Sequence, residues 1–167
     1  MYWCIIHIKS GNCHDLLRFF NEQQGIHAFL PMMEKWFSGA HTKEYRNILL
    51  FPDYLFIKAD MSKEHFHQTY QDLFHQISRF AKLLEGEAVI SMDEEEQRFF
   101  ERMFDGNGVI RHSVGNIINS KLNVESGPLK GMEQQIKKID RHKRIAYLDC
   151  QLLGTRMKAP LEVVNKV

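Results

Sequence analysis

YRNILLFPDYLFI, at residues 45–57, is an extended apolar run that Pro52 and Asp53 interrupt. Proline lacks a backbone N–H and is excluded from the middle of a sheet, so the run predicts a strand, a turn and a second strand. Residues 26–37 form another extended run, which Pro31 breaks, and a polar tip at 38–44 joins the two runs. We therefore expect an antiparallel sheet built around this region.

Helices and further strands are predicted on both sides of these runs. Residues 2–8 are aromatic and β-branched and predict a strand. A helix follows, capped by Asn12 and stopped by Gly25. Its apolar positions have helical spacing: Cys13, Leu16, Leu17 and Phe20.

A second helix is expected to open at Asp60 or Ser62. Its apolar stripe consists of Phe66, Tyr70, Leu73, Phe74 and Ile77. A short strand at 88–90 precedes a capping box at 91–94 and a third helix that ends before Gly106. That helix carries Phe99, Phe100, Met103 and Phe104. The order β-α-β-β-α-β plus a helix predicts an α/β sandwich with an antiparallel sheet.

The pattern changes after residue 105. Residues 106–113 contain two glycines and no periodicity, which is typical of a linker. Short β segments separated by Gly and Pro turns follow at 122–125, 133–139, 144–152 and 157–164, and they predict a small barrel. We expect an α+β chain with domains at 1–105 and 114–167.

Charge is divided unevenly along the chain, although the net charge is only +1. Residues 1–105 hold 11 Lys and Arg against 16 Asp and Glu, whereas residues 106–167 hold 11 against 5. The second part is therefore a candidate for binding a polyanion. A chance excess of charge on a small domain is the alternative.

Composition excludes several classes of protein. The longest apolar stretch, residues 48–57, is far shorter than the roughly 20 residues of a membrane span. No basic segment precedes the first apolar run, so no signal peptide is expected. Three cysteines without CxxC spacing favour a reducing setting, and we expect a cytoplasmic monomer.

No motif for catalysis or metal binding stands out. The acidic run 93–96 fits the first turn of a helix, where the dipole stabilises negative charge. The glycines at 127–131 have turn spacing rather than phosphate-loop spacing. Cys13-His14 lacks a second ligand pair, and His65 and His67 do not share a helix face. We expect no enzyme activity, cofactor or metal; a deep pocket with perturbed carboxylates or histidines would indicate an enzyme instead.

Several of these motifs resemble the NusG family of transcription elongation factors. Trp3, Phe29-Leu30-Pro31 and the segment LFPDYLF at 50–56 resemble its N-terminal (NGN) domain, with Asp53 in the usual glycine place as in RfaH-type paralogs. The segments VESGPLKG at 124–131, IKKID at 136–140 and LEVV at 161–164 resemble a KOW domain, an SH3-like small β-barrel. The resemblance covers essentially the whole chain.

Within that family, the basic run KKIDRHKR at 137–144 resembles LoaP-type antiterminators of Gram-positive bacteria, and Gln134 or Gln135 replaces a glycine usual in NusG. This resemblance implies an operon-specific factor that suppresses pausing and termination. A KOW-type protein that binds RNA or the ribosome and couples transcription to translation is the alternative.

The resemblance implies that the N-terminal domain binds the clamp helices of the RNA polymerase β′ subunit. The residues expected at that contact are Trp3, Leu30, Pro31, Phe51, Pro52, Tyr54 and Phe56. His67 and Thr69 belong to a short match with a His-Thr-Thr element that, in RfaH, contacts the other side of the polymerase cleft. Strand alternation turns some of these side chains away from the helices and could expose an aromatic patch. A plain hydrophobic core is the alternative.

The basic half is expected to bind a structured RNA hairpin in a leader transcript. Because Tyr147 is the only aromatic residue in this half, recognition by shape and groove contacts is favoured over capture of unpaired bases. The candidate RNA-binding residues are Lys130, Lys137, Lys138, Arg141, His142, Lys143, Arg144 and Arg156. Cations gathered on one rim neutralise phosphates, and Arg also pairs with guanine edges. A solvated hairpin tip is the alternative. RfaH also suggests contacts between non-template DNA and Lys9, His14 and Arg18.

Overall fold

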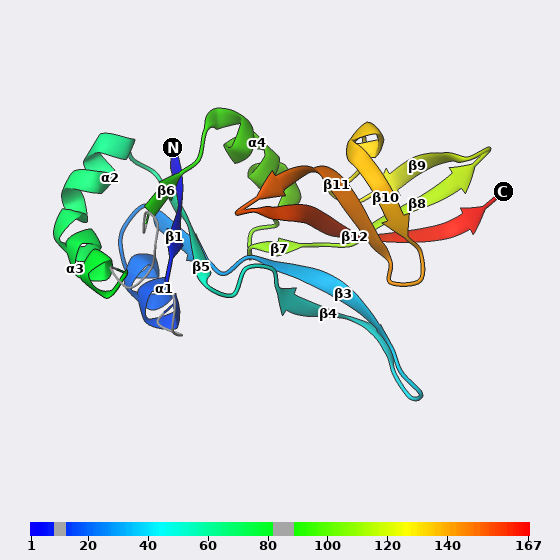
Figure 1. The fold of residues 1–167 in the computed structure, drawn as a ribbon, viewed down its shortest axis with the longest axis horizontal. Helices are drawn as coiled ribbons and strands as arrows, with labels where there is room; N and C mark the ends of the chain where they lie inside the picture. The colour runs from blue at the N-terminus through cyan, green and yellow to red at the C-terminus, as the bar shows by residue number, and fades with distance from the viewer. Residues whose placement is uncertain (9–12, 82–88) are drawn as a thin grey trace. The chain divides into compact units, whose positions relative to one another are not determined.

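The computed structural model describes residues 1–8, 13–81 and 89–167, apart from the side chains at 77–81 (Figure 1). The described residues form two compact units. The first consists of Met1–Pro31 and Phe51–Phe100, and the second of Met32–Leu50 and Glu101–Val167. The second unit thus includes a segment from the first third of the chain.

A four-stranded antiparallel sheet, in the order β2-β5-β1-β6, is the centre of the first unit. Its strands are β1 (Tyr2–His7), β2 (Ile26–Phe29), β5 (Tyr54–Ala59) and β6 (Val89–Ser91). The turn at Pro52-Asp53 immediately precedes β5, as the sequence predicts. The expected antiparallel sheet is therefore present.

Helices α1 (Cys13–Asn21), α2 (Lys63–Thr69) and α3 (Gln71–Ala81) lie on one side of this sheet (Figure 1). Alternate strand residues meet them in a buried core that includes Cys4, Ile6, Leu55, Ile57, Phe20 and Phe66. Leu16 and Leu17 pack against the same core, which confirms the predicted apolar face of α1. Asn12, its predicted cap, lies outside the described residues.

The single helix expected after Asp60 is two helices in the structure. Ser62 caps α2 by accepting a hydrogen bond from the His65 backbone N–H at 3.1 Å. At Tyr70 the backbone leaves helical geometry, with φ −108° and ψ 15°, and α3 begins at the next residue. The apolar stripe continues because Phe66, Tyr70 and Phe74 remain in ring contact across the break.

The capping box of α4 (Glu94–Met103) lies two residues later than predicted. The Asp93 carboxylate accepts from the Glu96 backbone N–H at 2.8 Å, and Glu96 accepts from the Asp93 N–H at 2.9 Å. Ser91 instead ends β6, where its hydroxyl hydrogen-bonds the Tyr2 hydroxyl at 2.8 Å. The prediction was wrong because Ser and Asp are equally good caps, and only sheet pairing decides between them.

The second unit contains a three-stranded sheet in the order β4-β3-β7. Strands β3 (Met32–Ser38) and β4 (Lys43–Leu49) form an antiparallel hairpin, and β7 (Val109–Ile110) pairs in parallel with β3. Strand β7 lies within the predicted linker 106–113, and both of its residues are buried. Two adjacent β-branched residues are enough here to extend the sheet by one short strand.

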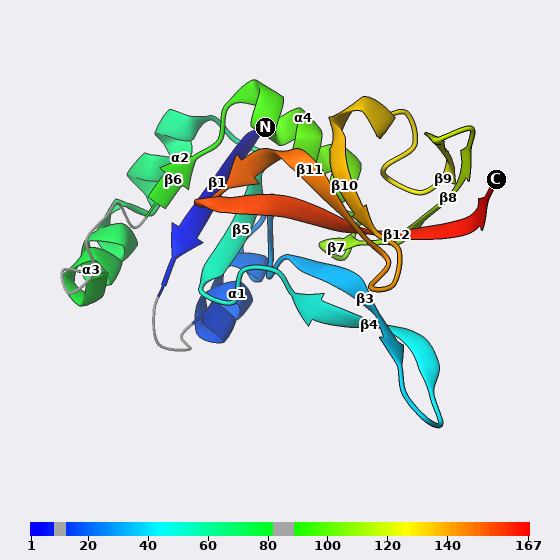
Figure 2. The ribbon, with the colours of Figure 1, turned by 45° about the vertical axis from the view of Figure 1, so that its right-hand side comes forward.

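The other strands of the second unit form a five-stranded sheet in the order β10-β11-β12-β8-β9. They are β8 (Ser113–Ile118), β9 (Lys121–Ser126), β10 (Ile136–Asp140), β11 (Ile145–Leu152) and β12 (Thr155–Lys166). Strand β12 also lies against β3 (Figure 2). The mixed α/β character is as expected.

The predicted barrel is not confirmed, because no sheet among the described residues closes on itself. Closure requires the two edge strands, β9 and β10, to pair. The 3-10 helix η1 (Glu133–Gln135) contacts β9 and β11 instead, and Glu133 accepts the backbone N–H of Val124 at 3.0 Å. One free backbone group of the edge strand is thereby satisfied by a side chain.

Strand β8 was not predicted, because Gly115 and Asn116 weaken its β pattern. The glycine is required by close strand packing. A Cβ at Gly115 would lie 2.6 Å from the Asn123 carbonyl oxygen. Tertiary contact, rather than local propensity, therefore accounts for this residue in the strand.

Candidate nucleic-acid interface

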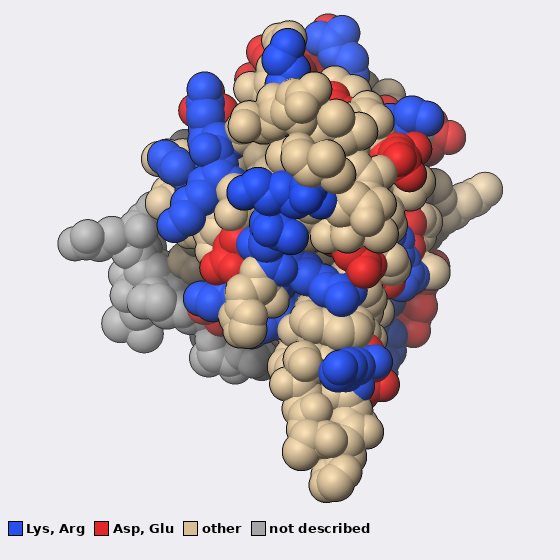
Figure 3. All heavy atoms as spheres, turned by 90° about the vertical axis from the view of Figure 1, so that its right-hand side faces the viewer, with Lys and Arg blue, Asp and Glu red and all other residues tan. Residues whose placement is uncertain are grey.

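The cations of the basic run lie on the β10–β11 hairpin of the second unit. Lys137 and Lys138 are exposed on β10, and Arg141, His142 and Lys143 are exposed in the turn. Asp140 shapes this turn by accepting the Lys143 backbone N–H at 2.9 Å. Lys and Arg side chains gather on this unit, with a few Asp and Glu among them (Figure 3).

Arg144 differs from the other cations of the run because its side chain is held within the protein. Its guanidinium lies 3.7 Å from the centre of the Trp36 ring. The same group donates to the Tyr45 hydroxyl at 3.3 Å and forms an ion pair with Glu162 at 3.0 Å. Its contact with RNA stays a prediction, but an RNA phosphate would have to compete with these three partners.

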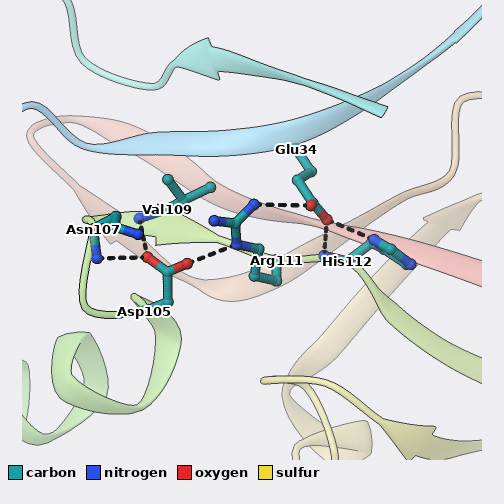
Figure 4. Close-up of polar contacts among 6 residues, drawn as sticks. All are labelled: Glu34, Asp105, Asn107, Val109, Arg111 and His112. Carbon is teal, nitrogen blue, oxygen red and sulfur yellow. Dashed lines mark hydrogen bonds and ion pairs between the residues drawn. The ribbon is translucent and has the colours of Figure 1, made fainter. Parts of the chain in front are cut away.

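A network of hydrogen bonds and ion pairs lies at the base of the β3–β4 hairpin (Figure 4). Glu34 on β3 accepts from the backbone N–H of His112 at 2.6 Å and lies 2.5 Å from its Nδ1. Arg111 bridges Glu34, at 3.2 Å, and Asp105, at 2.6 Å. The His112 ring in turn stacks on Tyr45, with centres 4.1 Å apart.

The carboxylates of this network are stabilised as anions. Burial raises the pKa of Glu34, but hydrogen bonds from His112 and Arg111 outweigh it, so the pKa is lowered from its ordinary value. Burial opposes ionisation of Asp105 too, and the backbone N–H of Val109 together with Arg111 lowers its pKa. The network is therefore a structural ion-pair cluster in which every charge has a partner.

The remaining candidate RNA residues are spread over the second unit. Lys137 forms an exposed ion pair with Asp149 at 3.3 Å, and the Lys138 ammonium lies 5.8 Å from the centre of the Tyr147 ring. Lys130 is exposed, and its carbonyl accepts from the Arg102 guanidinium. Arg156 is exposed on β12 and has no ion pair within the described residues. The contacts of Arg144 with Trp36 and Tyr45 were not predicted from the sequence, because no local pattern links positions so far apart.

The aromatic residues predicted to contact polymerase are mostly buried. Trp3, Leu30, Pro31, Phe51 and Phe56 are buried, Tyr54 is half-buried and Pro52 is exposed. Within the first unit, Phe29 contacts Trp3 and Phe56, and Phe56 also contacts Phe51 and the Phe100 ring of α4. These side chains therefore do not form an exposed aromatic patch, because they pack on one another and on Phe100. Their role in binding polymerase stays a prediction.

Tyr54 and Trp3 differ from the rest of this set. The Tyr54 ring is stacked on His7 with centres 4.4 Å apart, and the residue is half-buried. The indole N–H of Trp3 is buried without an acceptor among the described residues. Such an unpaired donor is uncommon in a protein interior.

His67 lies at a pocket on α2 and α3 with a volume of about 310 Å³. Its lining residues are His67, Gln68, Gln71, Phe74 and His75. His67 Nε2 is 2.9 Å from the Tyr2 hydroxyl, while the Thr69 hydroxyl donates to the His65 carbonyl at 2.8 Å. Of the suggested DNA contacts, His14 and Arg18 are exposed on α1, and Lys9 lies outside the described residues.

The described residues contain no group of three or more His, Cys, Asp or Glu arranged to hold a metal. Cys4 and Cys13 are buried, and burial raises the pKa of the Cys4 thiol to about 12. No helix within the described ranges is long and apolar enough to cross a membrane. The described residues thus form a unit of helices on an antiparallel sheet, and a β-rich unit that carries the exposed cations of the basic run.

The N-terminal 101 residues identify the family of the chain. The NusG family model, described as "Transcription termination factor nusG", matches residues 1–101. This is more than half of the chain, which therefore belongs to the NusG family of transcription elongation and termination factors. Members of this family are transcription factors rather than enzymes, and they typically bind RNA polymerase. Among curated proteins, no sequence matches the chain significantly.

Proposed function

We propose that this chain is an operon-specific elongation and antitermination factor of the LoaP-type branch of the NusG family. The observation that carries the proposal is the strongly basic second part of a NusG-family chain, with 11 Lys and Arg against 5 Asp and Glu in residues 106–167. The first domain binds the β′ clamp helices of polymerase. The basic domain binds a hairpin in the nascent leader transcript.

The basic domain, residues 114–167, acts as a KOW domain of SH3-like type. The five strands β8 to β12, which form one sheet, support this assignment. The turn at Gly127-Pro128 is anchored by Ser113, whose hydroxyl accepts the Leu129 backbone N–H at 3.0 Å. Gly127 has φ +94°, a conformation that favours glycine, which explains the glycine before Pro128 in the VESGPLKG motif.

The mechanism is binding rather than chemistry. A factor that prefers the closed clamp lowers the population of the paused polymerase, by as much as its affinities for the two states differ. The RNA contact raises the local concentration of the factor at one operon, because the second binding event becomes intramolecular. Two weak contacts then act together, and terminators downstream are read through.

The exposed cations provide the RNA contact. Arg141 and Lys143 lie at the tip of the β10–β11 hairpin and have no ion pair within the described residues. They can approach phosphates without first breaking an internal contact, and Arg141 can also pair with a guanine edge. Arg144, by contrast, is a member of the internal cluster with Trp36.

The polymerase contact uses the exposed members of the predicted set. Pro52 and Thr69 are exposed, and Tyr54 and His67 are half-buried. The buried members, such as Phe56, contribute indirectly, because their packing holds the sheet in shape. We place the activity in the cytoplasm, with a monomer as the active form.

A salt series tests the RNA part of this proposal. A pool of hairpin RNAs with randomised stems is selected on the full chain, and affinity is measured by gel shift at several salt concentrations. We expect the logarithm of the affinity to fall linearly with the logarithm of salt, because phosphate contacts release counterions. Selection of no hairpin, together with tight binding to ribosomes, would favour the coupling function instead.

A further inference from the structure

Three residues on neighbouring strands of the second unit form one row. Strand pairing places Lys138 on β10 opposite Tyr147 on β11, and Tyr147 opposite Lys158 on β12. Directly opposed side chains in antiparallel pairs have Cβ atoms about 5 Å apart. A tyrosine ring therefore has a lysine on each side.

The row lies on the outer face of the sheet. On β11 the neighbours of Tyr147, Ala146 and Leu148, are fully buried, so they point into the core. On β12 the neighbours of Lys158, Met157 and Ala159, are buried in the same way. Because side chains alternate along a strand, Tyr147 and Lys158 point outward, and both are partly exposed.

The surrounding charges leave this row positive. The Lys138 ammonium lies 5.8 Å from the centre of the Tyr147 ring, and neither Lys138 nor Lys158 has an ion pair within the described residues. Of the nearby carboxylates, Asp149 pairs with Lys137 and Glu162 pairs with Arg144. Asp140 lies at the end of β10 and accepts the Lys143 backbone N–H of the turn.

The next row of residues on the same face is not accessible to a ligand. It consists of Asp140, Ile145 and Pro160, and both Ile145 and Pro160 are buried. Beside it, Arg144 is held by Trp36 of the β3–β4 hairpin. The accessible part of the face is therefore the Tyr147 row, with Arg156 further along β12.

We propose that Tyr147 is a stacking platform for one unpaired RNA base, and that Lys138 and Lys158 bind the phosphates on either side. An aromatic ring with cations beside it is the arrangement by which proteins hold single-stranded nucleic acid. The inference rests on the proposed RNA binding by the basic domain, and it replaces recognition by shape and groove contacts alone with a contact to an unpaired base. The recognised RNA contains an unpaired nucleotide, in a loop or bulge, rather than a stem alone.

The test compares two labelled RNAs by fluorescence anisotropy with the full chain. One is a single strand of mixed sequence, about 12 nucleotides long, which is a usual length for such sites. The other is the matching duplex. Tyr147→Ala should weaken binding of the single strand by about 5- to 150-fold, the loss of one base–aromatic stack, and change duplex binding by less than about twofold.

Two further variants separate stacking from charge and from misfolding. Tyr147→Phe keeps the ring and should bind the single strand like the unchanged chain. The pair Lys138→Gln and Lys158→Gln should reduce the salt slope by about 1.4, or about 0.7 for each lost phosphate contact. The control pair Lys121→Gln and Lys166→Gln removes the same charge from exposed sites on β9 and β12. It should leave the slope nearly unchanged.

The outcomes distinguish this inference from the proposed function. If the unchanged chain binds neither RNA, both fail. If it binds RNA with a salt dependence but Tyr147→Ala loses nothing, or loses equally on the duplex, RNA binding stands and the base platform is rejected. Competition by polyglutamate as strong as that by RNA would also reject it, because an anion surface needs no ring.

Discussion

At the residue scale, the internal contacts of Arg144 separate it from its neighbour Arg141. Replacing Arg144 by Ala removes the contact with Trp36 and leaves Glu162 without its partner. We expect a loss of about 1–3 kcal/mol in the free energy of unfolding, from one cation–π contact and one charged hydrogen bond. Arg141→Ala, at an exposed site, should change it by less than about 0.5 kcal/mol.

Urea denaturation of the two variants measures this difference. RNA affinity is measured on the same two variants. Arg141→Ala should weaken RNA binding although its stability is nearly unchanged. Equal stability of both variants would mean that the Trp36 contact contributes nothing in solution.

Gly115 is a second position at which a single atom matters. A Cβ there would lie 2.6 Å from the Asn123 carbonyl oxygen, so Gly115→Ala must displace β9. We expect a loss of about 1–3 kcal/mol, the usual effect of overpacking. Gly106→Ala is the matched control, because nothing lies within 4 Å of its added Cβ. Thermal melts of the two variants should differ clearly; a melt of Gly115→Ala like that of the control would show that the strands can separate without cost.

At the element scale, the base of the β3–β4 hairpin should be sensitive to acid. The pKa of Glu34 is lowered by its contacts with His112 and Arg111, which outweigh its burial. A carboxyl with a lowered folded pKa stabilises the fold fully above its ordinary pKa of 4.5, and this contribution is lost as the pH falls through the folded value. Stability of the second unit should therefore decrease below about pH 4.5.

Denaturation curves between neutral pH and pH 3 test this in Glu34→Gln. The variant should be less stable at neutral pH, and the difference from the unchanged chain should shrink as the pH falls. Glu44→Gln is the control: it removes a carboxylate whose ion pair with Arg46 is exposed, so it should change the stability far less than Glu34→Gln. A constant difference for Glu34→Gln at every pH would contradict the assigned ion pairs.

Elements with a local signal could be predicted from the sequence, and those fixed by distant contacts could not. The strand after Pro52-Asp53 and the apolar face of α1 follow from proline chemistry and helical spacing, and both are present. Strand β8 depends on close packing at Gly115, and the break at Tyr70 interrupts a stripe that is periodic throughout. The basic run was visible in the sequence, but the capture of Arg144 by a hairpin 99 residues away was not.

At the scale of the whole molecule, the proposed function requires two contacts that can be lost separately. Tyr54 is the best position for testing the polymerase contact, because it is half-buried and belongs to the predicted set. Phe56 is fully buried, so a charge there would disrupt the fold instead. Tyr54→Glu should reduce retention of bacterial RNA polymerase by the full chain while RNA affinity stays the same.

The pair Arg141→Ala and Lys143→Ala should do the reverse, with normal retention of polymerase and weaker RNA binding. In a transcription assay on a template with the hairpin and a downstream terminator, both variants should lower readthrough, because each removes one of two coupled contacts. On a template without the hairpin, only Tyr54→Glu should lower the readthrough that remains. If the Arg141 and Lys143 variant reads through both templates like the unchanged chain, the basic domain does not recruit the factor, and the operon-specific part of the proposal fails while family membership stands.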